Sequence, residues 1–281
     1  CTRKTEGYQE GGSNIVMNDF SFNGWGMKFA ANLDNQINQT LFDTDVLADN
    51  DLLTLWDAQY RSRRNRVLEG GSVESDGQGT ILTTTECLLS LNRNEFTSKA
   101  DVEAWFRDDF GTERVLWLDH GFLVGDDTDS HIDTLARLCP DDTIVYVQCT
   151  DPDDIHYEEL QAMEQQLQTF RTAQGKPYRL LPLPMPDAIL ESDFPDAVAE
   201  EGDQRLPATY ANFLIINDAV LLPFYADEAL DARAARTLQT VFPTRSVIGI
   251  DCRVLLRQNG SLHCSTMQYP EPPANPIRQK V

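Results

Sequence analysis

The stretch Thr143-Ile144-Val145-Tyr146-Val147-Gln148 decides the fold class, together with the two segments that follow it, Tyr157–Thr172 and Tyr178–Leu183. A short run of β-branched and aromatic residues is typical of a buried strand. In the next segment apolar residues return at i, i+3, i+7 and i+10, which predicts a helix with one buried face; they are Leu160, Met163, Leu167 and Phe170. The third segment is a short apolar run that ends among prolines. Strand, helix and strand in this order predict a mixed α/β fold.

The same alternation of strands and helices continues on both sides of this stretch. Upstream, it predicts strands at Thr80–Leu89 and Val115–Leu118, a helix from Ser98 to Phe106, and a helix or turn at Ile132–Leu138. Downstream, it predicts a hairpin of Phe213–Ile216 with Val220–Pro223, a helix at Ala226–Val241, and strands at Val247–Ile250 and Arg253–Leu256. The recurrence, at about 50–60 residues, indicates a repeated α/β unit without a repeat of individual residues.

The composition is that of an ordinary folded domain, with 24% charged and 41% hydrophobic residues. The segment Pro184–Pro207 is acidic, polar and interrupted by prolines, which predicts a long surface loop rather than a linker between domains. We therefore expect residues 1–281 to form a single domain with a well-buried core.

The charge is strongly negative, because 45 Asp and Glu face 23 Lys and Arg and leave a formal charge of −22. Such a field repels phosphate backbones and anionic lipid, so we expect neither a nucleic-acid partner nor a membrane partner. No apolar stretch approaches the roughly 20 residues that a transmembrane helix needs. The charge instead favours small cations as ligands.

The six cysteines are Cys1, Cys87, Cys139, Cys149, Cys252 and Cys264. None of them forms a Cys-x-x-Cys pair, which argues against a zinc ribbon or a thioredoxin-like site. We expect free thiols in a reducing, cytoplasmic compartment. The sequence starts with Cys-Thr-Arg-Lys and without an initiator Met, so a removed targeting segment is left open.

Three segments combine glycine with reactive residues, and the first is Leu68-Glu69-Gly70-Gly71-Ser72, which leads to the turn at Asp76-Gly77. Two glycines after a carboxylate let the backbone pass close to a ligand while Glu69 points inward. The alternative is an ordinary turn before a hairpin with a solvated Glu69. Taken alone, this segment fits the alternative better.

The second segment, Gly125–Asp133, surrounds a histidine with carboxylates: Asp126, Asp127 and Asp129 precede His131, and Asp133 follows it. Close carboxylates raise the pKa of an imidazole and favour an imidazolium that can deliver a proton. A calcium loop is a second interpretation, although the central Gly and the distal Glu of that motif are missing. An acidic surface loop is a third.

The third segment places Cys264 beside His263, soon after the turn at Asn259-Gly260. A cysteine next to a histidine after a turn fits an activated thiolate, whereas most free cysteines are buried core residues. A soft nucleophile, a histidine and a pair of carboxylates suit attack on a cationic carbon. A guanidinium is such an electrophile, because two carboxylates can bind its nitrogens and orient its carbon toward sulfur. A papain-like protease would need an oxyanion hole and has no use for the carboxylates.

These residues, with further segments, resemble the agmatine deiminase family of the guanidine-modifying pentein superfamily, which also contains bacterial peptidylarginine deiminases. The segments that carry the resemblance run in family order: Phe22-Asn23-Gly24-Trp25-Gly26, Leu68–Ser72, Asp76–Thr80, Cys87-Leu88-Leu89 with Asn92-Arg93-Asn94, Asp127–Asp133, Tyr210-Ala211-Asn212-Phe213, Phe242-Pro243 with Ile248-Gly249-Ile250, and His263–Gln268. Together they cover about residues 19 to 270.

The resemblance implies a pentein fold, an α/β propeller of five ββαβ-type units around a pseudo-five-fold axis with the site in the central channel. It implies hydrolysis of a guanidinium without metal or organic cofactor: agmatine and water would give N-carbamoylputrescine and ammonia, a step of putrescine and polyamine biosynthesis. The partner would be a small cationic guanidinium substrate, and a homo-oligomer is left open.

Carried over by position, the resemblance implies that Cys264 is the nucleophile and His131 the general acid and base. Glu69 and Asp133 would hold the guanidinium, and a thiouronium adduct would form on Cys264. Asp127 would face the substrate, and Trp25 would form a wall of the channel.

The family also carries an Arg-Asp pair upstream of its Phe-Asn-x-Trp-Gly segment, and no Asp precedes Asp19 here. We therefore expect a single pentein deiminase domain over residues 1–281 that is truncated at its N-terminus, with the first unit incomplete. Two alternatives stay open. A peptidylarginine deiminase would need a basic rim such as Arg61, Arg63, Arg64 and Arg66. A catalytically silent guanidine-binding protein would have the fold with an incomplete site.

Overall fold

The computed structural model describes residues 2–3, 15–44, 59–197 and 203–268, which form a mixed α/β structure. Its strands make four three-stranded sheets: β1 (Thr2–Arg3), β2 (Ile15–Ser21) and β3 (Gln59–Val67); β4 (Val73–Ser75), β5 (Thr80–Thr84) and β6 (Arg114–Leu118); β7 (Ala136–Cys139), β8 (Thr143–Gln148) and β9 (Arg179–Pro184); β10 (Leu214–Ile215), β11 (Ala219–Phe224) and β12 (Ser246–Asp251).

The helices are mostly short. The α-helices are α1 (Gly24–Met27), α2 (Ile37–Asp43), α3 (Thr85–Leu88), α4 (Lys99–Phe110), α5 (Tyr157–Thr169), α6 (Glu228–Val241) and α7 (Arg253–Leu256). Single 3-10 turns are η1 (Asp34–Gln36), η2 (Gly70–Ser72), η3 (Ile132–Thr134), η4 (Glu191–Asp193) and η5 (His263–Ser265). Within the described ranges, none of these helices combines the length and apolar composition that a membrane span requires.

All four sheets share one topology. In each, the first strand pairs antiparallel with the middle strand, and the middle strand pairs parallel with the third. In the last three sheets a long helix, α4, α5 or α6, connects the middle strand to the third, as a parallel pairing requires. The predicted α/β repeat is therefore confirmed as a repeat of topology in the described residues.

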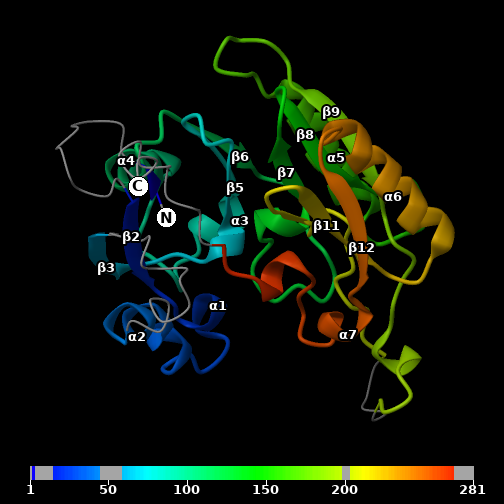
Figure 1. Ribbon diagram of the computed structural model, residues 1–281, viewed down its shortest axis with the longest axis horizontal. Coiled ribbons are helices and arrows are strands. Elements are labelled where there is room, and N and C mark those ends of the chain that lie inside the picture. The colour runs from blue at the N-terminus through cyan, green and yellow to red at the C-terminus, as the bar shows by residue number, and fades with distance from the viewer. Residues whose placement is uncertain (1, 4–14, 45–58, 198–202, 269–281) are drawn as a thin grey trace, which may run out of the picture.

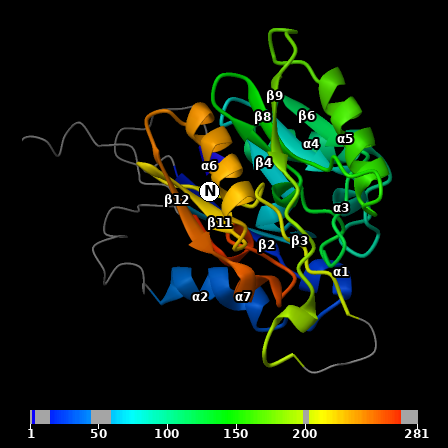
Figure 2. The ribbon, with the colours of Figure 1, turned by 90° about the vertical axis from the view of Figure 1, so that its right-hand side faces the viewer.

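The predicted strand–helix–strand stretch between Thr143 and Leu183 is confirmed, although its helix ends at Thr169 rather than Thr172. The strand Thr143–Gln148 is β8, and α5 buries Leu160, Met163 and Leu167 against the sheet. Figures 1 and 2 show α5 and α6 on the outer side of the sheets, and α6 contacts both β9 and β12. The sheets and helices thus enclose apolar cores and leave the loops at the strand ends to build a site.

One predicted strand is too long, and another is a helix. The strand predicted at Thr80–Leu89 stops at Thr84, because the Thr84 hydroxyl accepts a hydrogen bond from the Cys87 amide and starts helix α3. Arg253–Leu256 is helix α7 rather than a strand, and the Asp251 carboxylate accepts from the Arg253 amide at 3.1 Å at its start. Apolar content alone does not distinguish a short strand from a single helical turn.

The segment Ile132–Leu138, predicted as a helix or turn, divides into η3 and the first part of β7. The five cysteines in the described ranges are free thiols, as expected, and Cys1 lies outside those ranges.

Candidate active site

The three glycine-containing segments meet at one end of the sheets. Glu69 lies between β3 and β4, His131 and Asp133 lie just ahead of β7, and Cys264 lies in η5 after β12. The turns η2 and η3 contact each other, which joins the first two segments. The four predicted catalytic residues therefore lie in segments that come together, with Glu69 against His131 and Cys264 against Asp133.

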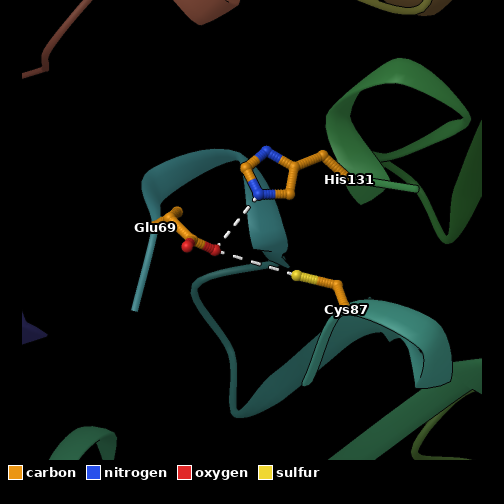
Figure 3. Close-up of side chains that lie close together, drawn as sticks. All are labelled: Glu69, Cys87 and His131. Atoms are coloured by element: carbon orange, nitrogen blue, oxygen red, sulfur yellow. Dashed lines mark hydrogen bonds and ion pairs between the residues drawn. The ribbon is translucent and has the colours of Figure 1, made fainter. Parts of the chain in front are cut away.

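Glu69 is the centre of the first half of the site (Figure 3). Its Oε2 lies 3.3 Å from Nε2 of His131 and 3.8 Å from Sγ of Cys87. All three residues are buried. The prediction that Glu69 points inward is correct, and the solvated alternative is wrong.

Arg93 holds Glu69 from the other side. Its Nε donates to both carboxylate oxygens, at 3.0 Å to Oε1 and 2.9 Å to Oε2. The rest of the guanidinium donates to the Thr128 carbonyl and to the Asp129 carboxylate. Asp129 and Ser130 have left-handed backbone angles, φ 62 and φ 60, just before His131. Arg93 thus fixes both the carboxylate and the turn that presents the histidine.

Gly71 lets the first segment approach the second. A Cβ on Gly71 would lie 2.6 Å from Nδ1 of His131 and 2.9 Å from each carboxylate oxygen of Asp133, closer than any side chain can sit. A Cβ on Gly70 would have nothing within 4 Å. The predicted close approach of backbone to site is therefore made by the second glycine alone.

Asp133 is the centre of the second half. Its Oδ2 lies 2.7 Å from Nδ1 of His263, 3.1 Å from Nδ2 of Asn212 and 3.6 Å from Sγ of Cys264. Its Oδ1 is buried and has no hydrogen-bond partner within the described part of the chain. Cys264 as a residue is exposed, while its sulfur faces inward toward Asp133 and Asn212. A buried acceptor without a donor, next to a sulfur, suits a cationic ligand that donates N–H groups.

Glu69, Cys87, His131 and Arg93 form the part of the site that we call the Glu69 half. Its electrostatics favour a protonated His131. Burial by itself lowers the pKa of His131, but hydrogen bonds to Cys87 and Glu69 and the charge of Asp133 outweigh it and raise the pKa well above its ordinary value. Burial raises the pKa of Glu69, and the hydrogen bond and charge of His131 together with Arg93 bring it below the usual value. An imidazolium is therefore poised to give a proton.

Asp133, Asn212, His263 and Cys264 form the Asp133 half of the site, which favours the neutral thiol form of Cys264. Burial, followed by the charge of Asp133, raises the pKa of Cys264 to about 12. Burial also opposes ionisation of Asp133, but His263 and the charges of His131 and Arg137 lower its pKa. In the unliganded site the negative charge thus resides on Asp133 and the proton stays on sulfur.

Asp127 contacts the turn that carries the nucleophile. Its Oδ2 accepts from Nδ2 of Asn259 at 3.1 Å, and Asn259 is left-handed at φ 58. The adjoining Gly260 is close-packed, since a Cβ there would lie 3.0 Å from Cβ of Cys264. Burial raises the pKa of Asp127. Contact with substrate stays a prediction for this residue.

Trp25 lies in a left-handed turn at φ 55, with ring centroids 5.0 Å from Phe22 and 5.7 Å from Phe29. The next residue, Gly26, packs against Arg93, because a Cβ on it would lie 3.3 Å from Nη1. The predicted Phe-Asn-Gly-Trp-Gly segment is thereby placed against the Glu69 half. The wall of the channel formed by Trp25 stays a prediction.

A metal ion has one candidate site in the described ranges, the ligand atoms of Glu69, Cys87 and His131, which lie within 4.8 Å of one another. The spacing suits a small tetrahedral ion. Arg93, however, already donates to both oxygens of Glu69, and its fixed positive charge opposes a cation there. The three residues therefore fit a proton-transfer network better than a metal site.

The acids of the second segment point to separate partners. Asp126 accepts from the Thr128 and Ser130 amides, Asp127 from Asn259, and Asp129 from Lys28 and Arg93. A calcium loop directs its carboxylates at one point, so this arrangement argues against that interpretation.

Four further residues contact the predicted catalytic groups: Cys87, Arg93, Asn212 and His263. Only His263 stood out in the sequence, as the neighbour of Cys264, although each of the four lies inside a segment that carries the family resemblance. Their role depends on contacts between distant segments, such as the 52 residues between Asn212 and Cys264. Sequence spacing gives no sign of such contacts.

Comparison with known proteins shows the family to which this chain is similar. The family model described as Porphyromonas-type peptidyl-arginine deiminase matches residues 8–270. An agmatine deiminase of Pseudomonas fluorescens is 37% identical over 222 residues, which are 76% of this chain and 60% of that protein. This chain thus spans less than two thirds of that relative.

Solved structures of deiminases are also similar to this chain. A candidate arginine deiminase from Porphyromonas gingivalis is 51% identical with a TM-score of 0.79, and the match covers 91% of this chain and 70% of that one. A C. jejuni agmatine deiminase with substrate bound is 40% identical with a TM-score of 0.75, over 88% of this chain and 66% of that one.

Proposed function

Because the chain belongs to the Porphyromonas-type peptidyl-arginine deiminase family, we propose that it hydrolyses a guanidinium group, with agmatine and water giving N-carbamoylputrescine and ammonia. The observation that carries the proposal is the pairing of Sγ of Cys264 with Asp133 at 3.6 Å, beside a buried carboxylate oxygen that lacks a donor. A guanidinium supplies the missing donor and brings its carbon to the sulfur.

Binding of the cation also prepares the nucleophile. The charge of Asp133 is one of the causes that keep Cys264 protonated, and a guanidinium on Asp133 offsets that charge. The thiol can then release its proton to solvent. The resulting thiolate lies next to an electrophile that is already held in place.

The first half of the reaction forms a carbon–sulfur bond and breaks a carbon–nitrogen bond. The Cys264 thiolate adds to the guanidinium carbon, and the His131 imidazolium gives its proton to the departing nitrogen, which leaves as ammonia. A cationic thiouronium stays on sulfur, and His131 is left neutral. The Glu69 carboxylate stabilises His131 in its charged form before this step.

The second half reverses these roles. His131 takes a proton from water as the oxygen adds to the thiouronium carbon. The carbon–sulfur bond then breaks, the thiolate leaves, and the remaining proton is lost as the ureido product forms. The ammonia released earlier binds that proton, so atoms and charge balance over the cycle. No metal or organic cofactor enters this proposal.

Peptidylarginine is the alternative substrate, and the arginines of β3 bear on it. Arg63 pairs with Asp109 at 2.5 Å and Arg64 pairs with Asp19 at 3.2 Å, while Arg66 stacks on Phe96 at 4.7 Å. Three of the four arginines predicted for a basic rim are engaged in this way, which leaves Arg61 as the remaining candidate to hold a peptide carboxylate. This favours the small cation agmatine.

The proposal also covers the fold, the cellular location and the pathway. Four sheets of one topology support a single pentein domain over residues 1–281, with five units around a pseudo-five-fold axis. Free thiols support a cytoplasmic location, and the agmatine reaction would serve polyamine biosynthesis. A catalytically silent guanidine-binding protein has less support, because Cys264 contacts Asp133 and His131 contacts Glu69.

The test is ammonia release from agmatine, from free arginine and from a peptide that ends in arginine. We expect turnover of agmatine to exceed that of the other two, and none with Cys264→Ser. Preferred turnover of the peptide would replace agmatine with the alternative substrate. If none of the three substrates releases ammonia, the proposed activity is wrong.

A further inference from the structure

The loop between β6 and η3, residues 119–131, brings Asp127 and His131 into the site. Helix α5 and the residue before it supply three acceptors to backbone amides of this loop: His156 to Val124 at 2.8 Å, Glu159 to Gly121 at 3.4 Å, and Gln166 to Asp119 at 2.8 Å. Among these three side chains, only His156 is buried. Its contact with the loop is therefore the one that water is least able to replace.

The hydrogen bonds around His156 determine which ring nitrogen carries the proton. A backbone amide can only donate, so Nε2, which lies 2.8 Å from the Val124 nitrogen, must be unprotonated. The other nitrogen, Nδ1, lies 2.6 Å from Oδ1 of Asp154 and donates to it. Burial lowers the pKa of His156, which keeps the ring neutral. An imidazolium would carry a proton on Nε2 and could not accept from Val124.

Asp154 extends these contacts to the other side of the loop. Its Oδ2 accepts from Nη1 of Arg205 at 2.8 Å. In the described structure, Asp154 and Arg205 are the charged groups that act on His156, and they do so in opposite directions. The Arg205 carbonyl packs on Gly125, because a Cβ on Gly125 would lie 2.5 Å from that oxygen. The dipeptide Val124-Gly125 is thus held between the imidazole and the Arg205 backbone.

The same loop reaches His131 through a short run of hydrogen bonds. Asp126, the residue after this dipeptide, accepts from the backbone amides of Thr128 and Ser130, at 3.0 and 2.9 Å. The Thr128 hydroxyl accepts from the His131 amide at 3.2 Å. The turn that presents His131 is therefore built directly on the residues that His156 holds.

We propose that His156 is a positioning residue for the proposed reaction: its neutral imidazole accepts a hydrogen bond from the Val124 amide and so holds the loop that presents His131 to the substrate. A misplacement of a reacting group by about 1 Å can cost on the order of 10²-fold in rate, so the position of this loop matters for turnover. The role rests on the proposed function, because it acts through the proposed general acid.

The experiment replaces the imidazole with and without a substitute acceptor. His156→Gln places an amide oxygen near the position of Nε2, whereas His156→Leu fills the same space without an acceptor. We expect His156→Leu to lower kcat/KM for agmatine on the order of 10-fold, and His156→Gln to stay within about threefold of wild type. Steady-state ammonia release measures both variants.

Amide hydrogen exchange of residues 119–131, followed by mass spectrometry, measures the loop without turnover. His156→Leu should exchange this segment on the order of 10-fold faster, because the Val124 amide has lost its acceptor, and His156→Gln should stay near the wild-type rate. The matched control is Glu159→Leu on the same helix, because water can replace this partly exposed carboxylate at the Gly121 amide. It should match wild type in both measurements.

The pattern of rescue separates positioning from a purely structural role. If His156 only filled space, leucine would preserve turnover and exchange at least as well as glutamine. Wild-type turnover and exchange in a folded His156→Leu would therefore overturn the proposal. Equal losses in the two folded variants would also overturn it, because the acceptor would then make no difference.

Should either variant fail to fold, the wild type provides the decision. The ¹⁵N signals of the His156 ring should show a proton on Nδ1 and none on Nε2, and a proton on Nε2 would overturn the proposal. Neither the exchange nor the ring signals require turnover. A failure of ammonia release therefore leaves these results intact, and a failure here leaves the deiminase test intact.

Discussion

The two carboxylates of the site, Glu69 and Asp133, are prepared in opposite ways. Both oxygens of Glu69 accept from the Arg93 guanidinium, and Oε2 also contacts His131. Asp133 uses Oδ2 for His263 and Asn212 and keeps Oδ1 buried without a donor in the described structure. One carboxylate is already neutralised by a cation of the protein, and the other is left incomplete.

The difference assigns the two residues different tasks. A buried acceptor without a partner costs about 1–3 kcal/mol, and a ligand that donates to it recovers that free energy. Asp133 should therefore contribute most to binding of the cation. Glu69 gains little from a second cation and instead keeps His131 charged and oriented. The following predictions test this division between the Glu69 half and the Asp133 half.

The largest expected effect separates the two thiols. Cys264→Ser should lower kcat by on the order of 10⁴-fold or more, as loss of a nucleophile does. Cys87→Ser should keep kcat within about tenfold, because a serine hydroxyl can replace the weak hydrogen bonds that the Cys87 thiol makes to Glu69, at 3.8 Å, and to His131. Steady-state ammonia release measures both. Equal losses would mean that the nucleophile has been assigned to the wrong half.

The next effect separates the two carboxylates. Asp133→Asn should lower kcat/KM by on the order of 10³-fold, mainly through KM, because it removes the charge that holds the guanidinium. Glu69→Gln should act mainly on kcat, because it weakens the support of the His131 imidazolium. The split between KM and kcat in agmatine turnover checks this division. A larger KM effect from Glu69→Gln would reverse it.

The third effect concerns Gly71, where the first segment contacts His131 and Asp133. Gly71→Ala should lower kcat/KM by about 10²-fold, because its Cβ would displace His131 and Asp133 by a sizeable fraction of an ångström. Gly70→Ala is the matched control, since nothing lies within 4 Å of its Cβ, and it should stay within about threefold of wild type. Similar losses in both variants would point to the loop conformation rather than to the contact.

The smallest effect concerns the pH dependence of stability. The folded-state pKa of His131 lies above its ordinary value of 6.5, so its charge stabilises the fold fully below pH 6.5. That contribution is lost as the pH rises through the folded-state pKa. The free energy of unfolding of wild type should therefore exceed that of His131→Gln most at pH 6.

The difference in the free energy of unfolding between wild type and His131→Gln should narrow toward alkaline pH, by up to about 1.4 kcal/mol per pH unit. Urea unfolding at pH 6, 7.5 and 9 measures it. A difference that widens with pH would contradict a charged His131.

Much of the fold was predictable because local patterns determine it. The strand Thr143–Gln148, the helix capped by Ser98 and the helix ending at Val241 follow from periodicity and capping. Short elements were not predictable in the same way. Arg253–Leu256 has an apolar composition that suits a strand, and the preceding Asp251 starts a helical turn instead.

The grouping of Cys264, His131, Glu69 and Asp133 was predictable, because residue type and family position agree for them, and their catalytic roles stay predictions. The supporting residues of the site were not predictable, because their roles arise from packing between segments. Arg93 contacts Asp129 from 36 residues away, and His263 contacts Asp133 from 130 residues away. A histidine, an arginine or an asparagine at such positions has no distinguishing local pattern.

The position of the site in the repeated topology has a consequence for folding. Glu69, Asp133 and Asn212 each lie just ahead of the first strand of a sheet, so three successive sheets each contribute one side chain from the same place. The sheets form from neighbouring segments, whereas the contact between Cys264 and Asp133 spans 131 residues. Closing such long loops costs conformational entropy, so we expect the contacts of the site to form after those within each sheet. On heating or in denaturant, we then expect the proposed activity to be lost before the sheets unfold.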